Sequence, residues 1–368
     1  MNRKTLRSGF TTGSAAAAAA KAALLVWHGR PEPQEVDIPL PAGGRLRVPL
    51  EWVQLSAEGV RASVMKDAGD DPDVTHRARI QVSVSPLDPS GSTRLQLRGG
   101  RGVGRVTKPG LPVPVGEAAI NPSPRWQIQE AAREALRETG GSGSFEVLVQ
   151  VPDGERLAQK TMNPRLGVLG GISILGTRGT VEPYSSASYK GTIDSELDVA
   201  LAAGCLEIGF ATGGRSERLL RAVLDRLPAE CFVLTADYFA YSLQGAAFRG
   251  FQGIHLGCFF GKLIKMAQGH PYTHARSAAL DFGLLARWCS ASSLEAGLTE
   301  RIASANTARE VLENLRTSPA FAGIIQGIVN RAIIAARGFA GNGADLRFYV
   351  FDFNGERLYP PLDHWSSP

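Results

Sequence analysis

The densest group of ionisable side chains lies between Lys66 and His76, where four aspartates fall within seven positions. Carboxylates this close repel one another unless a cation neutralises them, so the segment favours a divalent-cation site or a base with a raised pKa. The spacing of an EF-hand loop is missing, and a solvated acidic turn is the alternative. We expect chemistry here, with Lys66 binding substrate and four other residues as catalytic candidates: Asp67, Asp70, Asp71 and His76.

A glycine turn, Thr212-Gly213-Gly214, follows an apolar stretch that is typical of a buried strand, 206–211, and precedes a predicted helix, 216–227. The carboxyl end of a strand is where nucleotides bind in open α/β sheets. Asp237 lies just past the next predicted strand, roughly 20 residues on, where an acid can hold ribose hydroxyls. The GxGxxG spacing of a nicotinamide site is missing, so the turn suits S-adenosylmethionine, which has a ribose but no phosphates. A turn needed only for strand-to-helix geometry is the alternative. The cofactor-binding candidates are Thr212, Gly213, Gly214, Glu217 and Asp237.

Arginines and lysines recur beside glycines and prolines between residues 98 and 108, and after the Asn-Pro pairs at 121 and 163. Guanidinium groups in such loops suit bidentate capture of carboxylate or phosphate, and together they indicate an anion-binding basin. The net charge of +5 comes without a lysine-rich tail, which favours a small polyanion over nucleic acid. The substrate-binding candidates of the basin are Thr107, Lys108, Asn121, Arg125, Asn163 and Arg165.

Lys262 and Lys265 are three residues apart, so on a helix they share one face and are suited to bind the substrate by clamping its carboxylates. A solvated face is the alternative. The preceding segment is not a phosphate loop, because the first glycine of GxxxxGK would fall at Leu256. His270 and His274 have the spacing of zinc ligands on a helix, but Pro271 breaks that helix, so we expect substrate contacts and no metal.

The elements that position these groups differ between the two halves of the chain. Residues 6–28 are interpreted as a Gly-Thr loop that opens an alanine-rich helix. Alternating strands follow at 36–38, 46–48, 59–64 and 80–84, then a helix from 125 to 140, a strand at 145–151 and a packed loop region at 163–180. From 192 onward, apolar strands at 206–211, 231–235 and 253–257 alternate with helices, which predicts parallel βαβ units in a doubly wound sheet. Further helices at 279–290, 294–303, 308–315 and 320–336 precede a strand-turn-strand ending at 346–359.

The four cysteines form no CxxC pair and mostly sit in apolar runs, which favours buried, reduced thiols and a reducing cytosol. Arg3, Lys4 and Arg7 before the apolar run 15–27 imitate a secretory signal, but Lys21 interrupts that run. Gly13-Ser14 is better explained as a turn and helix N-cap. No apolar run reaches the ~20 residues needed to span a bilayer, so we expect a cytoplasmic protein without membrane partners.

Five long segments, taken in chain order, resemble one family: 6–14, 64–76, 102–122, 163–177 and 261–274. The sequence is similar to the cobalt-precorrin-5B C(1)-methyltransferases of the CbiD type from residue 6 to about 280. It departs from the family pattern at Ala15, where cysteine is frequent, and at Arg77 and Tyr241, where glycine is usual. A thiol at position 15 is therefore not essential here, and Tyr241 is expected to alter the pocket beyond Asp237.

The resemblance implies methyl transfer from S-adenosylmethionine to ring carbon 1 of cobalt-precorrin-5B, giving cobalt-precorrin-6A on the anaerobic route to cobalamin. It also implies an α+β N-terminal domain with a largely β-rich core, 1–188, that binds the tetrapyrrole. A C-terminal Rossmann-like, doubly wound α/β domain with a final hairpin, 189–368, would bind the methyl donor. The two implied domains agree with the residue patterns above. A cationic basin suits a macrocycle that carries many carboxylates, and a nucleotide-type sheet edge suits the methyl donor.

Two other functions stay open at this point. Residues 9–16 faintly resemble the phosphate loop of galactokinase-like enzymes, so a small-molecule kinase would hold an anion at that helix N-terminus. A non-catalytic tetrapyrrole carrier would use the same cationic basin without consuming a methyl donor. The sequence also leaves open a homo-oligomer and whether the substrate carries cobalt.

Overall fold

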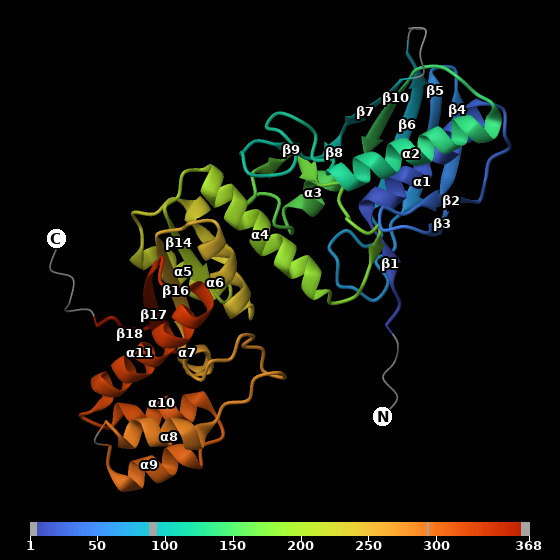
Figure 1. The fold of residues 1–368 in the computed structure, drawn as a ribbon. Helices are drawn as coiled ribbons and strands as arrows, with labels where there is room; N and C mark the ends of the chain where they lie inside the picture. The colour runs from blue at the N-terminus through green and yellow to red at the C-terminus, as the bar shows by residue number, and fades with distance from the viewer. Residues whose placement is uncertain (1–5, 88–93, 293, 362–368) are drawn as a thin grey trace. The chain divides into compact units, whose positions relative to one another are not determined.

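The computed structural model describes residues 6–87, 94–292 and 294–361. The chain divides into two compact units, Met1–Tyr189 and Lys190–Pro368 (Figure 1). Arg3 and Lys4, part of the stretch that imitates a secretory signal, lie outside the described residues. Within the described ranges, none of the helices combines the length and the apolar character that crossing a membrane requires.

A five-stranded sheet with the order β4-β5-β6-β10-β7 forms the base of the N-terminal unit. Neighbouring strands are antiparallel, except that β10 and β7 run parallel. The predicted strands over 59–64, 80–84 and 145–151 are confirmed, and the alternate side chains Ile80, Val82 and Val84 are fully buried. The strands are β4 (Trp52–Ser56), β5 (Gly59–Met65), β6 (Arg79–Pro86), β7 (Leu95–Gly99) and β10 (Phe145–Gln150).

Two helices cover one face of this sheet: α1 (Thr12–Trp27) packs against β5 and β6, and α2 (Pro122–Thr139) packs on α1 (Figure 1). The alanines at 15–20 are all fully buried, because their small side chains let the helix and the sheet approach closely. Both predicted helices are confirmed. The α2 helix ends at Gly140, whose φ of 64° is the left-handed conformation common at helix C-termini.

The start of α1 differs from the prediction. Thr11, not Gly13-Ser14, is the N-cap, and its hydroxyl accepts a hydrogen bond from the Ser14 N–H at 3.2 Å. The extended backbone of Thr11 allows this geometry, whereas Gly13 and Ser14 already belong to the helix. Lys21 is 3% exposed, and its ammonium donates to Glu134 at 3.0 Å. The α1 helix therefore lies in the core, and the ion pair between Lys21 and Glu134 links it to α2.

Short elements complete the N-terminal unit. The β2–β3 hairpin confirms the strands predicted at 36–38 and 46–48. The predicted loop region at 163–180 contains strands of only two residues, which pair with other short strands. The elements are β1 (Gly9–Phe10), β2 (Glu35–Pro39), β3 (Arg45–Pro49), β8 (Gly102–Val103), β9 (Arg105–Val106), α3 (Gly154–Ala158), β11 (Val168–Leu169), β12 (Gly171–Ile172) and β13 (Thr180–Val181).

Arg77 holds a backbone conformation that favours glycine. Its φ is 60°, and its N–H donates to the Lys66 carbonyl at 2.8 Å. A left-handed conformation costs a non-glycine residue roughly 1–2 kcal/mol. We therefore expect Arg77→Gly to raise the free energy of unfolding by about 1 kcal/mol, measured by urea denaturation. Arg79→Gly, in the extended strand β6, is the control and should lower it; a less stable Arg77→Gly variant would contradict the explanation.

A second five-stranded sheet, with the order β15-β14-β16-β17-β18, forms the base of the C-terminal unit. Adjacent strands from β15 to β17 are parallel, and β18 joins β17 antiparallel at the edge. The predicted apolar strands and the strand-turn-strand ending are confirmed. The strands are β14 (Glu207–Ala211), β15 (Phe232–Leu234), β16 (Gly253–Phe259), β17 (Asp345–Phe351) and β18 (Arg357–Tyr359).

Helices cover both faces of this sheet. The α5 helix packs Leu220 against Phe232 and Tyr349 on one face, and α6, α7 and α11 pack on the other, which explains the continuous apolar strands. The four helices predicted after residue 279 are confirmed. The sequence does not predict α6, because its apolar residues follow no clear helical period. The helices are α4 (Ser186–Ala202), α5 (Gly214–Val223), α6 (Phe239–Phe248), α7 (Phe260–Ala267), α8 (Phe282–Ser290), α9 (Ala296–Ala303), α10 (Ala308–Arg316) and α11 (Phe321–Ala340).

Candidate functional site

The C-terminal sheet has a point where the chain changes direction. From β14 the chain passes to β15 on one side and then to β16 on the other side. Such divergence leaves a crevice outside the carboxyl ends of the two strands, where nucleotides bind in open α/β sheets. Thr212 directly follows β14, Lys262 lies just past β16, and Asp237 lies shortly after β15. The structure therefore brings these predicted residues to one edge.

Gly213 and Gly214 have no packing or conformational reason to be glycine. Gly213 is extended, with a φ of 176°, and Gly214 lies outside the left-handed region. A Cβ atom added to either residue would meet nothing within 4 Å, whereas one added at Gly257 would come within 2.9 Å of Leu220. The alternative of a turn needed only for geometry is therefore not supported. The two glycines leave open space at the start of α5.

Asp237 belongs to a hydrogen-bonded network. Lys262 Nζ and Thr273 Oγ1 both donate to its Oδ1, the hydroxyl at 3.0 Å. Among the described residues, Asp237 Oδ2 has no hydrogen-bond partner, so it is available to accept from a ligand hydroxyl. The preceding residue, Ala236, has a φ of 48°, a conformation that side chains rarely adopt and that often marks functional sites.

Lys262 and Lys265 of α7 share one acceptor. Each ammonium donates to the Thr273 carbonyl at 3.1 Å, which confirms that the two side chains lie on the same face. Lys265 is 8% exposed, so the alternative of a solvated lysine face is wrong. Burial lowers the pKa of Lys265, and the charge of Lys262 lowers it further.

Glu217 and Tyr241 have partners of their own. Glu217 is 7% exposed and accepts from Arg221 Nη2 at 2.7 Å, one turn further along α5. Tyr241, in place of the glycine usual in the family, donates to Asp194 of α4 at 2.5 Å. Burial, helped by that carboxylate, raises the pKa of Tyr241 to about 12. The tyrosine therefore joins α6 to α4.

The segment between α7 and α8 supplies aromatic rings beside Asp237. The ring of Tyr272 lies 5.0 Å from that of Tyr238 and stacks on that of His274 at 5.9 Å. His274 Nδ1 accepts from the Arg276 N–H at 3.2 Å, and the His270 N–H donates to a carbonyl of α7. The two histidines are thus on a loop, as predicted, and the loop presents flat ring faces.

Every aspartate of the acidic turn after β5 has a hydrogen-bond donor. Asp67 pairs with the Arg7 guanidinium, and Asp70 accepts from the Arg7 N–H at 2.7 Å. Asp71 accepts from the Tyr184 N–H at 2.9 Å. The hydrogen bond from Arg7 lowers the pKa of Asp67 to about 2, although burial acts in the opposite direction. The prediction of a base with a raised pKa is wrong for Asp67.

Lys66 is the buried partner of this turn. It is 2% exposed, and its ammonium donates to Asp73 at 2.5 Å. Asp73 also accepts from the N–H and the hydroxyl of Thr75, both at 2.7 Å. Burial raises the pKa of Asp73, but Lys66 and Thr75 together bring it below its usual value. His76 is exposed and accepts from the Ala68 N–H at 3.1 Å, so the turn is an ordered loop.

Part of the predicted cationic basin lies beside the β9–β11 pair. The N–H and hydroxyl of Thr107 donate to the Gly167 carbonyl at 2.8 and 2.7 Å. The Lys108 side chain lies over Gly167, where an added Cβ would come within 2.4 Å of it. The structure therefore brings Thr107 and Lys108 together at Gly167, and Arg165 precedes that glycine by two residues in the chain.

The other candidates of the N-terminal unit have different surroundings. Asn163 is 7% exposed and accepts from the Ser173 hydroxyl at 3.2 Å, so it stabilises its own loop. Asn121 is the N-cap residue of α2, without a side-chain cap. Arg125, in the first turn of that helix, pairs with Glu117 at 3.2 Å, and its side chain is 35% exposed. Of these residues, Arg125 is the one that can reach a ligand carboxylate.

The N-terminus of α1 is closed to a phosphate group. Gly13 and Ser14 are buried, and their N–H groups donate to the Leu175 carbonyl and the Thr11 hydroxyl. The Ser14 hydroxyl donates to the Gly179 carbonyl at 2.6 Å. These groups are therefore not available to an anion, so the helix N-terminus does not provide the phosphate site that a small-molecule kinase would need.

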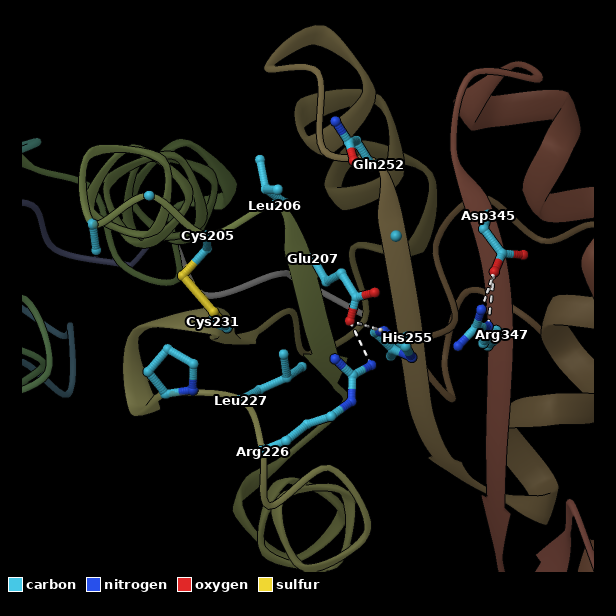
Figure 2. Close-up of a pocket in the computed structure, with 14 residues that line it drawn as sticks. Cys205, Leu206, Glu207, Arg226, Leu227, Cys231, Gln252, His255, Asp345 and Arg347 are labelled. Carbon is cyan, nitrogen blue, oxygen red and sulfur yellow. Dashed lines mark hydrogen bonds and ion pairs between the residues drawn. A yellow bond between two sulfur atoms is a disulfide. The ribbon is translucent and has the colours of Figure 1, made fainter. Parts of the chain in front are cut away.

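A cavity of about 450 Å³ opens at the opposite, amino edge of the C-terminal sheet (Figure 2). Glu207 of β14 accepts from Arg226 at 2.6 Å, and Arg347 pairs with Asp345 at 2.7 Å (Figure 2). His255 is 1% exposed, and burial lowers its pKa. The cations and carboxylates are paired one to one, so this cavity lacks the net positive charge that a polyanion requires. Nucleotides bind at the other edge of such sheets.

Two cysteines that line this cavity form a disulfide. Cys205 and Cys231 are bonded, with their Cα atoms 5.9 Å apart (Figure 2). They precede the neighbouring strands β14 and β15, so a sequence separation of 26 hides their closeness. The prediction of reduced thiols is wrong for this pair. Cys258 and Cys289 are buried free thiols, as predicted.

Comparisons with known proteins show which family the chain is similar to. Residues 1–183 match the family model CbiD, and residues 272–360 match the model described as CbiD, C-terminal domain. The cobalt-precorrin-5B C(1)-methyltransferase of Nitratidesulfovibrio vulgaris is 47% identical, covering 97% of this chain and 93% of the relative. The protein of that name from Geobacillus kaustophilus is 41% identical, covering 97% and 95%. A crystal structure of cobalamin biosynthesis protein (cbiD) from Archaeoglobus fulgidus is 30% identical, covering 70% of this chain and 78% of that chain with a TM-score of 0.40.

Proposed function

Because the chain belongs to the CbiD family, as its sequence motifs implied, we propose that it methylates cobalt-precorrin-5B at C-1. The product is cobalt-precorrin-6A, on the anaerobic route to cobalamin, and the methyl donor is S-adenosylmethionine. Two relatives that carry the name of this enzyme align with 97% of the chain and with more than nine tenths of their own lengths. The proposal therefore concerns the whole chain and not one of its units.

The open space beside Gly213 and Gly214 supports the donor site most directly. A Rossmann-like sheet holds the nucleoside against glycine at the carboxyl end of its first strand, where a side chain would obstruct it. Asp237 Oδ2 can accept from a ribose hydroxyl while Oδ1 stays with Lys262. Thr212 adds a hydroxyl at the end of β14. These residues fit a ribose-bearing donor without phosphates.

We assign the tetrapyrrole to the N-terminal unit. The Lys108 side chain lies over Gly167, Arg165 precedes that glycine by two residues, and Arg125 has a partly exposed guanidinium. Guanidinium groups bind carboxylates bidentately, and the macrocycle carries many carboxylates. Lys66, which is buried against Asp73, would act indirectly by holding the acidic turn in place.

The methyl group of a sulfonium is already activated, so the donor supplies the electrophile. The chain has to align the reactants and exclude water. Asp70 and His76 are the exposed members of the acidic turn, and we assign them any proton transfer with the ring. Asp67, with its pKa of about 2, stays ionised and orients Arg7.

One incubation tests the proposal. The purified full-length chain, methyl-labelled S-adenosylmethionine and cobalt-precorrin-5B should yield one labelled methyl group per ring and an equal amount of S-adenosylhomocysteine, measured by mass spectrometry. The Nitratidesulfovibrio vulgaris relative serves as the positive control. Binding of the corrinoid without any S-adenosylhomocysteine, while the control turns over, would identify a tetrapyrrole carrier and overturn the proposal.

A further inference from the structure

The ammonium of Lys265 is buried with too few acceptors. It is 8% exposed, and among the described residues its hydrogen-bond acceptor is the Thr273 carbonyl alone, at 3.1 Å. That carbonyl also accepts from Lys262 at 3.1 Å. An ammonium has three N–H donors, so two of those on Lys265 have no described protein acceptor. Donors withdrawn from water in this way favour an incoming acceptor.

The charge around the two lysines is also unbalanced. One carboxylate, that of Asp237, contacts them among the described residues, and it accepts from Lys262 and from the Thr273 hydroxyl. The cluster therefore holds two positive charges against one negative charge. Burial and the neighbouring Lys262 both lower the pKa of Lys265, although Asp237 acts in the opposite direction. A single additional carboxylate would restore neutrality.

The position of the cluster restricts what that carboxylate belongs to. Lys262 and Lys265 lie on α7, which begins where β16 ends at the carboxyl edge. Asp237, the proposed ribose ligand, is in direct contact with Lys262. A molecule whose ribose lies at Asp237 thus brings its other end near the lysines.

We propose that Lys265, together with Lys262, binds the carboxylate in the amino-acid part of the methyl donor. The two lysines therefore recognise the donor and not the tetrapyrrole, to which the sequence pattern assigned them. This inference rests on the donor site proposed above. It adds that the ammonium groups of the two lysines let this site select a ligand with an amino-acid tail over a bare nucleoside.

Calorimetric titration of the full-length chain tests the inference with two ligands. S-adenosylhomocysteine keeps the carboxylate, and its decarboxylated analogue lacks that group alone. We expect the wild-type chain to bind S-adenosylhomocysteine about 30-fold more tightly, the range of a charged hydrogen bond. Lys265→Met should remove this preference by weakening S-adenosylhomocysteine about 30-fold and leaving the analogue unchanged. Lys160→Met, which changes an exposed lysine of the N-terminal unit, is the matched control and should leave both affinities unchanged.

The possible results separate this inference from the proposed function. A wild-type chain that binds both ligands equally, or a Lys265→Met variant that weakens both alike, would overturn the inference and leave the donor site standing. An unchanged affinity for S-adenosylhomocysteine with a raised KM for the tetrapyrrole would also overturn it, because Lys265 would then serve the ring. A wild-type chain that binds neither ligand would overturn the donor site itself. The wild-type comparison holds even if the variant does not fold.

Discussion

Gly214→Val should weaken the binding of S-adenosylhomocysteine by about 100-fold and leave the fold intact. Gly214 is the first residue of α5, and a Cβ atom there meets no protein atom within 4 Å. The added side chain therefore has room in the free protein but would occupy the space proposed for the donor. Because the residue is exposed and outside the left-handed region, the free energy of unfolding should change by about 0.5 kcal/mol or less.

Gly297→Val provides a matched control for this prediction. Gly297 lies in the first turn of α9, in the same unit, and a Cβ atom there also meets nothing within 4 Å. This variant should keep both the stability and the donor affinity of the wild type. Calorimetric titration and urea denaturation of the three proteins give both quantities.

Two results would contradict the donor site at β14. If Gly214→Val binds S-adenosylhomocysteine as tightly as the wild type, the space beside the glycine is not used by the donor. If Gly214→Val unfolds while Gly297→Val does not, the glycine has a structural role that its surroundings do not reveal.

The sequence predicts most elements of this fold because their periods are strong. The alternation in β6 and the apolar runs of β14 and β16 correspond to strands with one and two buried faces. The α6 helix is the exception, since tertiary packing and not an amphipathic period decides its structure. The disulfide between Cys205 and Cys231 is also unpredictable from spacing, because it depends on which strands become neighbours.

In the candidate site too, some features follow from local sequence patterns, and others depend on tertiary contacts. Thr212 and Asp237 reach one edge as predicted, because the carboxyl ends of parallel strands necessarily meet there, and Lys262, predicted to bind substrate, lies at the same edge. The acidic turn was expected to contain a carboxylate of raised pKa, but Arg7, distant in sequence, reverses the shift at Asp67. Likewise, nothing in the spacing of Lys66 shows that it is buried, since burial depends on how the turn folds back on its own strand.

Asp73→Ala should lower the free energy of unfolding by about 3 kcal/mol, the second large effect that we expect. Lys66 is 2% exposed, and its ammonium relies on the Asp73 carboxylate at 2.5 Å. Removing the carboxylate leaves a buried cation without its counter-ion, which is far more costly than removing both partners. The double variant Lys66→Met/Asp73→Ala should therefore recover most of the loss. Urea denaturation at neutral pH measures all three stabilities.

The same pair predicts how stability depends on pH. The folded chain lowers the pKa of Asp73 below its usual value, so the ion pair contributes fully at neutral pH. That contribution should be lost as the pH falls below about 4, the ordinary range of an aspartate, and through the lower folded pKa. Asp73→Ala lacks this titration, so the stability difference between wild type and variant should shrink in acid.

Lys66→Met separates a structural lysine from one that binds substrate. If Lys66 serves only to hold the acidic turn, the methionine variant should lose less stability than Asp73→Ala, because Asp73 is partly exposed and still accepts two hydrogen bonds from Thr75 at 2.7 Å. Its KM for the tetrapyrrole should stay within about twofold of the wild type, since no contact worth a charged hydrogen bond is lost. A normal stability combined with a tenfold or larger rise in KM would return Lys66 to the substrate, and would mean that the acidic turn opens when the ring binds.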